Sequence, residues 1–192
     1  MSHAEQGVVA NRIAGGRQYQ IGAYRYLVWP YKGIDEIAPE ELEQLVDDLV
    51  PLVPGCSEAL LTFVADGLIL GVALSQATRL PLIVCRDHHY NMPERVELIQ
   101  KTAYFSRKLY FAKPSPGRAI CIIDAIISTG GTVCAAGSAL CGAGCRAAGV
   151  VAALEKVSYG GRERIVRELG IEPRVVYRLI EQEAAHLSVE RV

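Results

Sequence analysis

The stretch from Arg118 to Ala136, RAICIIDAIISTGGTVCAA, constrains the fold of this chain more than any other segment. A short apolar run ends at Asp124, a polar Gly-rich turn follows over residues 128–132, and small residues then continue at helical spacing. This order predicts a buried strand, a tight loop and the beginning of a helix. Free N–H groups at a helix N-terminus and a backbone without Cβ atoms suit a bound phosphate. An empty loop that caps the helix is the alternative.

Short apolar runs alternate with helical patterns through the rest of the chain. Strand-like runs cover residues 59–64, 80–85, 119–123, 149–154 and 175–180, and helical patterns cover 38–50, 68–77, 132–143 and 162–169. This alternation predicts an α/β fold with a central, mainly parallel sheet flanked by helices. Ligands of such sheets bind beyond the carboxyl ends of the strands, which is where the loop 128–132 lies.

The size and composition of the chain fit a single domain over residues 1–192. Its 192 residues, 51% of them hydrophobic and 21% charged, can bury a sizeable core. We expect the core over about residues 59–181 and an N-terminal arm or hood over about residues 1–35. Residues 1–20 show little periodicity and are expected to be irregular, residues 21–29 are β-like, and the residues after Glu181 are expected to form a polar tail.

A polar segment from Arg86 to Lys101 is too long for an ordinary connection. We expect a functional lid or a mobile excursion there, followed by an antiparallel ribbon over residues 102–112. His88 and His89 lie in this segment, either as solvated side chains or near a phosphate or metal.

Charge and hydropathy exclude several classes of protein. A net charge of −1 gives no electrostatic reason to expect direct nucleic-acid binding, and no apolar run reaches the length of a membrane span. The first residues show no signal-peptide pattern, so we expect a cytoplasmic protein. The six cysteines are then expected to be reduced, mostly as small buried side chains, although a soft-metal site on one helix face is an alternative.

Three segments resemble type I phosphoribosyltransferases. IIDAIISTGGT (Ile122 to Thr132) resembles the family's motif for phosphoribosyl pyrophosphate (PRPP). FVADGLILGVALSQATRLPLIVCR looks like the pyrophosphate loop with its helix and next strand, and NMPERVELIQKTAYFSRKLYF looks like the flexible loop. The resemblance is strongest to adenine and archaeal hypoxanthine/guanine phosphoribosyltransferases. It implies the family's fold, with a small N-terminal hood and a flexible lid, and transfer of 5-phosphoribose from PRPP to a purine or purine-like base, with release of pyrophosphate.

The resemblance also implies roles for individual residues. The 5-phosphate and ribose would be bound by Asp124, Ala125, Ser128, Thr129, Gly130, Gly131 and Thr132. The pyrophosphate would be bound by Asp66, Gly67, Arg86, Lys101 and Arg107. Catalytic roles would fall to Asp124 and Tyr104. The base would contact Ile126, Ile127 and Glu155 under a hood around residues 29–34. Mg²⁺ would be the cofactor, held indirectly by Asp124, and the protein would be a homodimer with PRPP and a nucleobase as its partners.

Simpler interpretations exist for several of these residues. Asp124 and Asp66 could be turn residues, and Tyr104 could pack within the ribbon. Lys101 and Arg107 could be surface cations, and Glu155 could be a surface acid beside Lys156.

The chain departs from the family pattern at three places. Ala125 stands where a second acid is usual, the pyrophosphate loop reads Val-Ala-Asp-Gly, and Asp87 follows Arg86. Each change bears on the ribose, metal or pyrophosphate. Two further hypotheses therefore stand beside a purine enzyme: a catalytically impaired, regulatory homologue that binds PRPP or a nucleotide, and a phosphoribosyltransferase for a non-purine acceptor.

Overall fold

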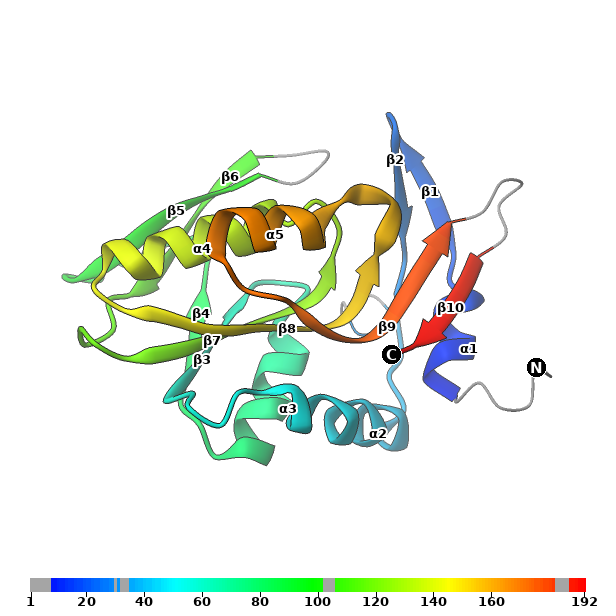
Figure 1. Cartoon of the computed structure of the whole chain (residues 1–192), viewed down its shortest axis with the longest axis horizontal. Helices are drawn as coiled ribbons and strands as arrows, with labels where there is room; N and C mark the ends of the chain where they lie inside the picture. Colours follow the sequence, from blue (N-terminus) through cyan, green and yellow to red (C-terminus); the bar gives the residue numbers. More distant parts are fainter. Residues whose placement is uncertain (1–7, 30, 32–34, 102–105, 182–186) are drawn as a thin grey trace.

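The computed structural model describes residues 8–29, 31, 35–101, 106–181 and 187–192 (Figure 1). Within these residues the main sheet has six strands in the order β10-β9-β8-β7-β3-β4. Five of these strands run parallel to one another, namely β3, β4, β7, β8 and β9, and β10 pairs with β9 in the antiparallel direction. The bounds are β3 Ala59–Phe63, β4 Leu82–Cys85, β7 Ala119–Ile127, β8 Arg146–Lys156, β9 Arg174–Glu181 and β10 Leu187–Arg191. The predicted α/β fold with a mainly parallel sheet is confirmed.

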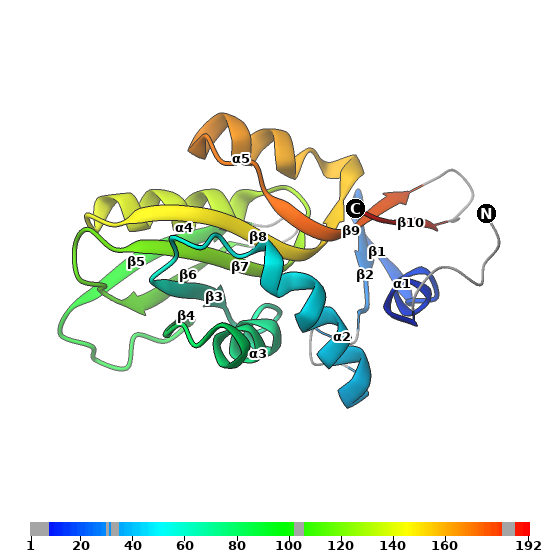
Figure 2. The same cartoon turned by 60° about the horizontal axis from the view of Figure 1, so that its bottom comes forward.

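Helices cover both faces of this sheet. α4 (Gly131–Gly142) and α5 (Gly161–Leu169) lie on one face, and α2 (Pro39–Leu49) and α3 (Leu68–Thr78) lie on the other, as Figures 1 and 2 show. Strand β7 contributes to both cores because its side chains alternate. Ile120 and Ile122 belong to the apolar cluster under α4, whereas Cys121 and Ile123 belong to the cluster that includes α2 and α3. Two short 3₁₀ turns, Val50–Leu52 and Val157–Tyr159, follow α2 and β8.

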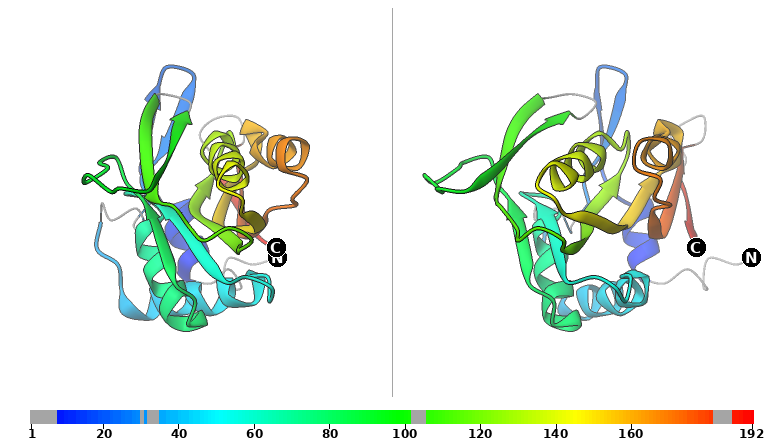
Figure 3. Two further views of the ribbon diagram at one scale, coloured as in Figure 1. Left: turned by 90° about the vertical axis from the view of Figure 1, so that its left-hand side faces the viewer. Right: turned by 60° about the vertical axis from the view of Figure 1, so that its left-hand side comes forward.

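Two antiparallel strand pairs stand outside the main sheet. The hairpin β1 (Gln18–Ile21) and β2 (Tyr24–Leu27) turns at Gly22, whose φ is 59°. The ribbon β5 (Arg95–Lys101) and β6 (Ser106–Ala112) covers the outer side of α4 and β4. Figure 3 shows the β1–β2 hairpin and the neighbouring ends of β5 and β6 on the same side of the molecule.

The structure differs from the sequence prediction at both ends of the chain. Residues 1–20 were expected to be irregular, but α1 spans Val8–Ala14 and packs Val9, Ala10 and Ile13 into the core. The expected polar tail is wrong beyond residue 186, since β10 pairs with β9 and buries Val189. Both elements depend on distant partners, which a local pattern does not reveal. The predicted excursion over residues 86–101 likewise ends in a regular strand, β5.

Four of the cysteines are buried, as expected: Cys85, Cys121, Cys134 and Cys145. Burial raises the pKa of Cys121 to about 12 and that of Cys134 to about 11, so these thiols stay protonated at neutral pH. Cys56 and Cys141 are exposed. No helix in the described part of the chain is long and apolar enough to cross a membrane.

A pair of valines tests whether β10 belongs to the fold. Val189 is 5% exposed and Val192 is 75% exposed. We expect Val189→Ala to lower the free energy of unfolding by about 1.5 kcal/mol, at roughly 0.8 kcal/mol for each buried carbon lost. Val192→Ala should leave it within about 0.5 kcal/mol. Urea denaturation measures both, and equal values for the two variants would contradict the burial of β10.

Candidate functional site

A cavity of about 480 Å³ opens at the carboxyl ends of β3 and β7. Its lining comes from the strand-end loops, from the β1–β2 hairpin and from the β5–β6 ribbon. It is lined by Ile21, Tyr24, Tyr26, Phe63, Val64, Ala65, Asp66, Gln100, Arg107, Asp124, Ile126, Ile127, Ser128, Thr129, Gly130, Gly131, Thr132 and Val133. Residues from four separate segments therefore meet at one place.

The loop between β7 and α4, residues 128–130, contributes to the lining of the cavity. Gly130 has φ of +71° and precedes the first residue of α4, so the N-terminus of this helix faces the cavity. Ser128, Thr129 and Thr132, each of which carries a hydroxyl group, belong to the same lining. The helix dipole, the free N–H groups and the hydroxyls together favour an anion here. We call residues 128–132 the phosphate loop.

The backbone of helix α5 is in close contact with the phosphate loop and supports it. A Cβ atom on Gly161 would lie 2.1 Å from the carbonyl oxygen of Ser128, and one on Gly130 would lie 2.7 Å from the carbonyl oxygen of Gly161. The Arg164 guanidinium is 3.5 Å from the carbonyl oxygen of Thr129. Sequence reasoning missed Gly161, although the Gly-Gly pair after a strand could have indicated a close approach.

A second loop, residues 64–67, connects β3 to α3 and supplies Val64, Ala65 and Asp66 to the lining. The peptide bond between Val64 and Ala65 is cis. Thr62, which is fully buried, fixes this loop to β7, since its hydroxyl lies 2.9 Å from the carbonyl oxygen of Gly67 and 3.1 Å from that of Ile123. Gly67 itself is buried below the cavity, where a Cβ would lie 2.6 Å from the Thr62 hydroxyl.

The β5–β6 ribbon joins the two loops through side chains. Arg107 donates one hydrogen bond to the side chain of Gln100 (2.7 Å) and one to the carbonyl oxygen of Val64 (2.7 Å). The Gln100 amide group donates in turn to the hydroxyl of Thr132 (3.1 Å). Gln100 is 7% exposed, and the sequence analysis did not select it. Gln100 lies between exposed residues on a polar strand, so the sequence pattern did not indicate that it contacts Thr132.

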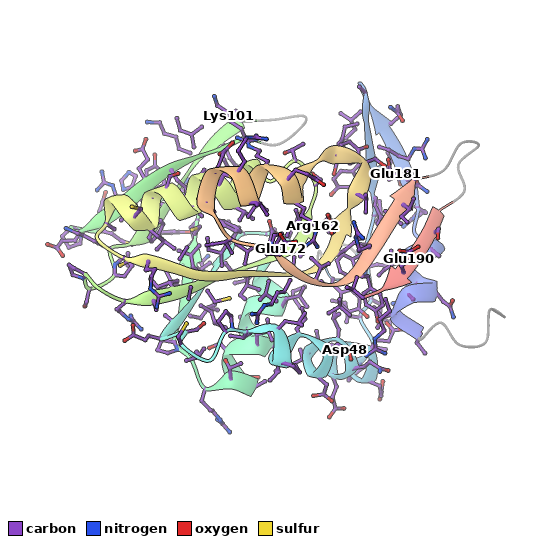
Figure 4. The ribbon with its side chains drawn as sticks, viewed as in Figure 1. Asp48, Lys101, Arg162, Glu172, Glu181 and Glu190 are labelled. Carbon is purple, nitrogen blue, oxygen red and sulfur yellow. The ribbon has the colours of Figure 1, made fainter. Side chains whose placement is uncertain are left out.

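Other ribbon residues proposed from the sequence lie elsewhere. The Lys101 side chain is exposed at the end of β5, outside the lining (Figure 4), although its carbonyl oxygen would be 2.3 Å from a Cβ on Gly131. Arg86 is exposed and outside the lining, and its backbone pairs with Tyr110 at 2.8 and 2.7 Å. Tyr104 falls outside the described residues.

Asp66 and Asp124 are the two acidic residues among the described residues that line the cavity. An Asp124 carboxylate oxygen accepts a hydrogen bond from the backbone N–H of Ala125 at 2.8 Å. The Ala125 side chain is fully buried in the cluster that contains Cys121 and Ile123, and it does not line the cavity. Position 125 thus faces the core under α2 and α3.

The hairpin supplies the aromatic border of the cavity. Tyr24 and Tyr26 line it beside Ile126 and Ile127. The hood was expected around residues 29–34, but Trp29 and Tyr31 are fully buried in the core, and residues 30 and 32–34 are outside the described part. The segment that borders the cavity therefore comes earlier in the chain.

Glu155, proposed as a base contact, lies outside the lining and is only 3% exposed. Its carboxylate accepts hydrogen bonds from the Arg162 guanidinium at 2.6 to 3.0 Å and lies 3.3 Å from Nε of Arg178. The hydrogen bond to Glu155 raises the pKa of Arg162. Arg162 also binds Glu172, beside it in Figure 4, so this cluster ties α5 to β8.

The sequence of this chain is similar to those of known phosphoribosyltransferases. It is 31% identical over 159 residues to the hypoxanthine/guanine phosphoribosyltransferase of Methanocella paludicola, covering 82% of each chain. This protein belongs to the type I phosphoribosyltransferase family. No family model matches the chain.

Solved phosphoribosyltransferases share the fold at lower identity. The adenine phosphoribosyltransferase of Thermoanaerobacter pseudethanolicus superposes with a TM-score of 0.73 at 16% identity, covering 88% of this chain and 97% of the other. That of Trypanosoma brucei, solved with AMP, pyrophosphate and ribose-5-phosphate, gives 0.70 at 15% identity, with 90% and 80% covered. The family resemblance found in the sequence is confirmed.

The contact between α5 and the phosphate loop can be tested with two glycines. In Gly161→Ala, a methyl group 2.1 Å from the Ser128 oxygen must displace α5 or the loop. We expect this phosphoribosyltransferase variant to bind ribose 5-phosphate at least about tenfold more weakly, a loss of roughly 1.4 kcal/mol. Gly142→Ala is the control, because a Cβ there meets nothing within 4 Å. Calorimetric titration measures both, and equal affinities would refute the support role.

Proposed function

We propose that this protein transfers 5-phosphoribose from PRPP to a purine base and releases pyrophosphate. The observation that carries the proposal is the single cavity in which the phosphate loop, two carboxylates and a tyrosine-lined apolar surface meet. These are the three kinds of surface that a sugar phosphate and a base require. The relative from Trypanosoma brucei was solved with AMP, pyrophosphate and ribose-5-phosphate, which supports the same ligand classes here.

In this proposal the phosphate loop binds the 5-phosphate. The N-terminus of α4 supplies N–H groups and a positive dipole end, and the hydroxyls at 128, 129 and 132 donate to the phosphate oxygens. The bond from Gln100 to Thr132 orients one of these hydroxyls. The loop needs no lysine or arginine of its own, because backbone groups at a helix N-terminus already favour an anion.

Asp124 is the residue that we assign to the ribose. It lies in the lining between the phosphate loop and the loop 64–67, where its carboxylate can accept hydrogen bonds from ribose hydroxyls. A negative charge beside the ribose also stabilises the positive charge that develops at the anomeric carbon as pyrophosphate leaves. No protein nucleophile is needed for this step.

The pyrophosphate would lie against the loop 64–67 and Arg107. Arg107 is the one cationic side chain among the described residues of the lining, and its bond to the Val64 carbonyl keeps it at this loop. The family resemblance added Gly67, Arg86 and Lys101 to the pyrophosphate contacts and gave Tyr104 a catalytic role. Gly67 has a packing role, and Arg86 and Lys101 would have to move to reach the cavity.

The residues present fit a Mg²⁺ ion that is held largely by the substrate. The described residues contain no cluster of three or more His, Cys, Asp or Glu side chains that could hold a metal ion. Asp66 and Asp124 share the cavity, and Mg²⁺ commonly takes one or two carboxylates together with substrate phosphate oxygens and water. Bound there, the ion would offset the charge of pyrophosphate and of the two carboxylates.

The base would lie between Ile126 and Ile127 and the hairpin tyrosines. Aromatic and apolar side chains on both sides suit the faces of a flat heteroaromatic ring. Glu155 is held by Arg162 and Arg178, so we assign it to the structure of this region rather than to direct contact.

The alternative is a regulatory homologue that binds PRPP or a nucleotide without turnover. The lone cation in the described lining, already bonded to Gln100 and Val64, favours it. The position of Ala125 favours the enzyme, because a side chain that faces the core is no ligand of the cavity. A homodimer and a cytoplasmic location stay predictions from the family and the sequence.

Turnover separates these two candidates. We expect pyrophosphate release when the protein is mixed with PRPP, Mg²⁺ and one of a panel of purines, with the nucleotide identified by chromatography. Asp124→Asn should lower kcat about a hundredfold, since one charge that stabilises the transition state is lost. Asp47→Asn, at an exposed position of α2 outside the lining, is the control. A rise in melting temperature with PRPP but no pyrophosphate release from any purine would favour the regulatory homologue.

The missing second acid gives a further prediction. Ala125→Asp places a carboxylate where the side chain is fully buried among apolar groups. We expect the free energy of unfolding to fall by about 3 kcal/mol, with no gain in pyrophosphate release. Ala112→Asp, on the exposed side of β6, is the matched control and should change stability little. A variant at 125 that is as stable as the parent and faster would show that this position does reach the ribose.

A further inference from the structure

Lys156, at the end of β8, is a buried charge that the proposed reaction does not use. Its side chain is 1% exposed, and it lies outside the cavity lining. Nζ is 2.9 Å from a Glu181 carboxylate oxygen and 4.4 Å from the ring centres of both Tyr24 and Tyr159. Figure 4 shows Glu181 at the end of β9, next to the hairpin. An ion pair and two aromatic faces offset the cost of burying the ammonium.

The same cluster holds the backbone of the hairpin. Lys156 donates a hydrogen bond to the carbonyl oxygen of Arg25, and the N–H of Arg25 donates to the Tyr159 hydroxyl at 2.9 Å. Both backbone polar groups of one β2 residue are therefore bonded to the end of β8 and to the 3₁₀ turn that follows it. The rings of Tyr24 and Tyr159 also pack together, with centres 4.8 Å apart.

Arg25 lies between the two tyrosines that line the cavity. Tyr24 and Tyr26 are its direct neighbours, so the position of Arg25 sets the position of both. The hairpin has little support of its own, since β1 is mostly exposed and a two-stranded hairpin is marginal in water. The contacts that hold Tyr24 and Tyr26 near Ile126 and Ile127 must therefore come from the core of the protein.

We propose that Lys156 and Tyr159 are positioning residues for the base subsite. They hold β2 against the carboxyl end of β8, so that Tyr24 and Tyr26 border the place where the base binds. Glu181 balances the charge of Lys156. We call Lys156, Tyr159 and Glu181 the hairpin anchor. The kinetic part of this proposal rests on the proposed function, whereas the structural part stands without it.

Tyr159→Phe tests the anchor with the least change to the packing. The variant keeps the ring beside Tyr24 and Lys156 and removes only the hydroxyl that accepts from the Arg25 amide. Hydrogen–deuterium exchange of a peptide covering β2 should become at least about threefold faster, because one amide loses its acceptor. Tyr177→Phe is the matched control, a buried tyrosine on β9 for which no hydrogen bond to the described part of the hairpin is found.

Kinetics test the consequence for the base. In Tyr159→Phe and in Lys156→Met we expect KM for the purine to rise about fivefold or more while KM for PRPP stays within about twofold, since the phosphate loop is held by Gly161 and Gln100 rather than by β2. A general loss of folding would alter both constants together and lower the melting temperature. The Tyr177→Phe control should change neither constant.

Each outcome decides a separate point. Faster exchange of β2 together with a selective rise in KM for the purine supports the proposal. Unchanged exchange overturns the anchor, and a higher KM with unchanged exchange would mean that Lys156 acts on the base by another route. If the parent protein forms no nucleotide with any purine, the proposed function and the role in base binding fail together. Exchange then still shows whether Lys156 and Tyr159 hold the hairpin.

Discussion

The candidate site depends on backbone contacts so close that a single methyl group would break them. Gly161 of α5 lies against the Ser128 carbonyl on one side of the phosphate loop, and Lys101 of the ribbon lies against Gly131 on the other. The loop is thus clamped between two elements that are far apart in the chain. An anion site made of N–H groups works only if these groups keep their directions, and backbone contact fixes them more firmly than flexible side chains could.

The distribution of charge in the cavity is related to the way the phosphate loop is built. The phosphate loop carries no charged side chain, and the charged residues in the described lining of the cavity are Asp66, Asp124 and Arg107. Two carboxylates and one guanidinium would not by themselves attract pyrophosphate. Under the proposed function, a divalent cation beside Asp66 and Asp124 would offset this charge when pyrophosphate binds, whereas the phosphate loop would need none.

Local sequence patterns predicted the sheet, its helices and the phosphate loop, because hydrophobic periodicity and a Gly-rich turn are properties of neighbouring residues. They failed where distant segments meet. Gln100 looks like any polar residue of an exposed strand until the ribbon brings it to Thr132. The hood was expected near Trp29, yet the hairpin before it borders the cavity, since Trp29 fills the core. The burial of Lys156 likewise depends on distant segments, since β9 and the hairpin contact it.

The difference between Asp124 and Ala125 shows how a linear motif can mislead. Counted along the chain, the two positions are equal members of an acidic pair, and loss of one carboxylate suggests a half-empty site. On a strand, however, neighbouring side chains point to opposite faces. Asp124 opens to the cavity, while Ala125 lies among Cys121 and Ile123 in the core under α2 and α3. In this backbone an alanine at 125 suits its surroundings better than a carboxylate would, because an unpaired buried charge costs several kcal/mol. The packing of residue 125 in the core therefore explains the alanine at this position before any effect on catalysis needs to be considered.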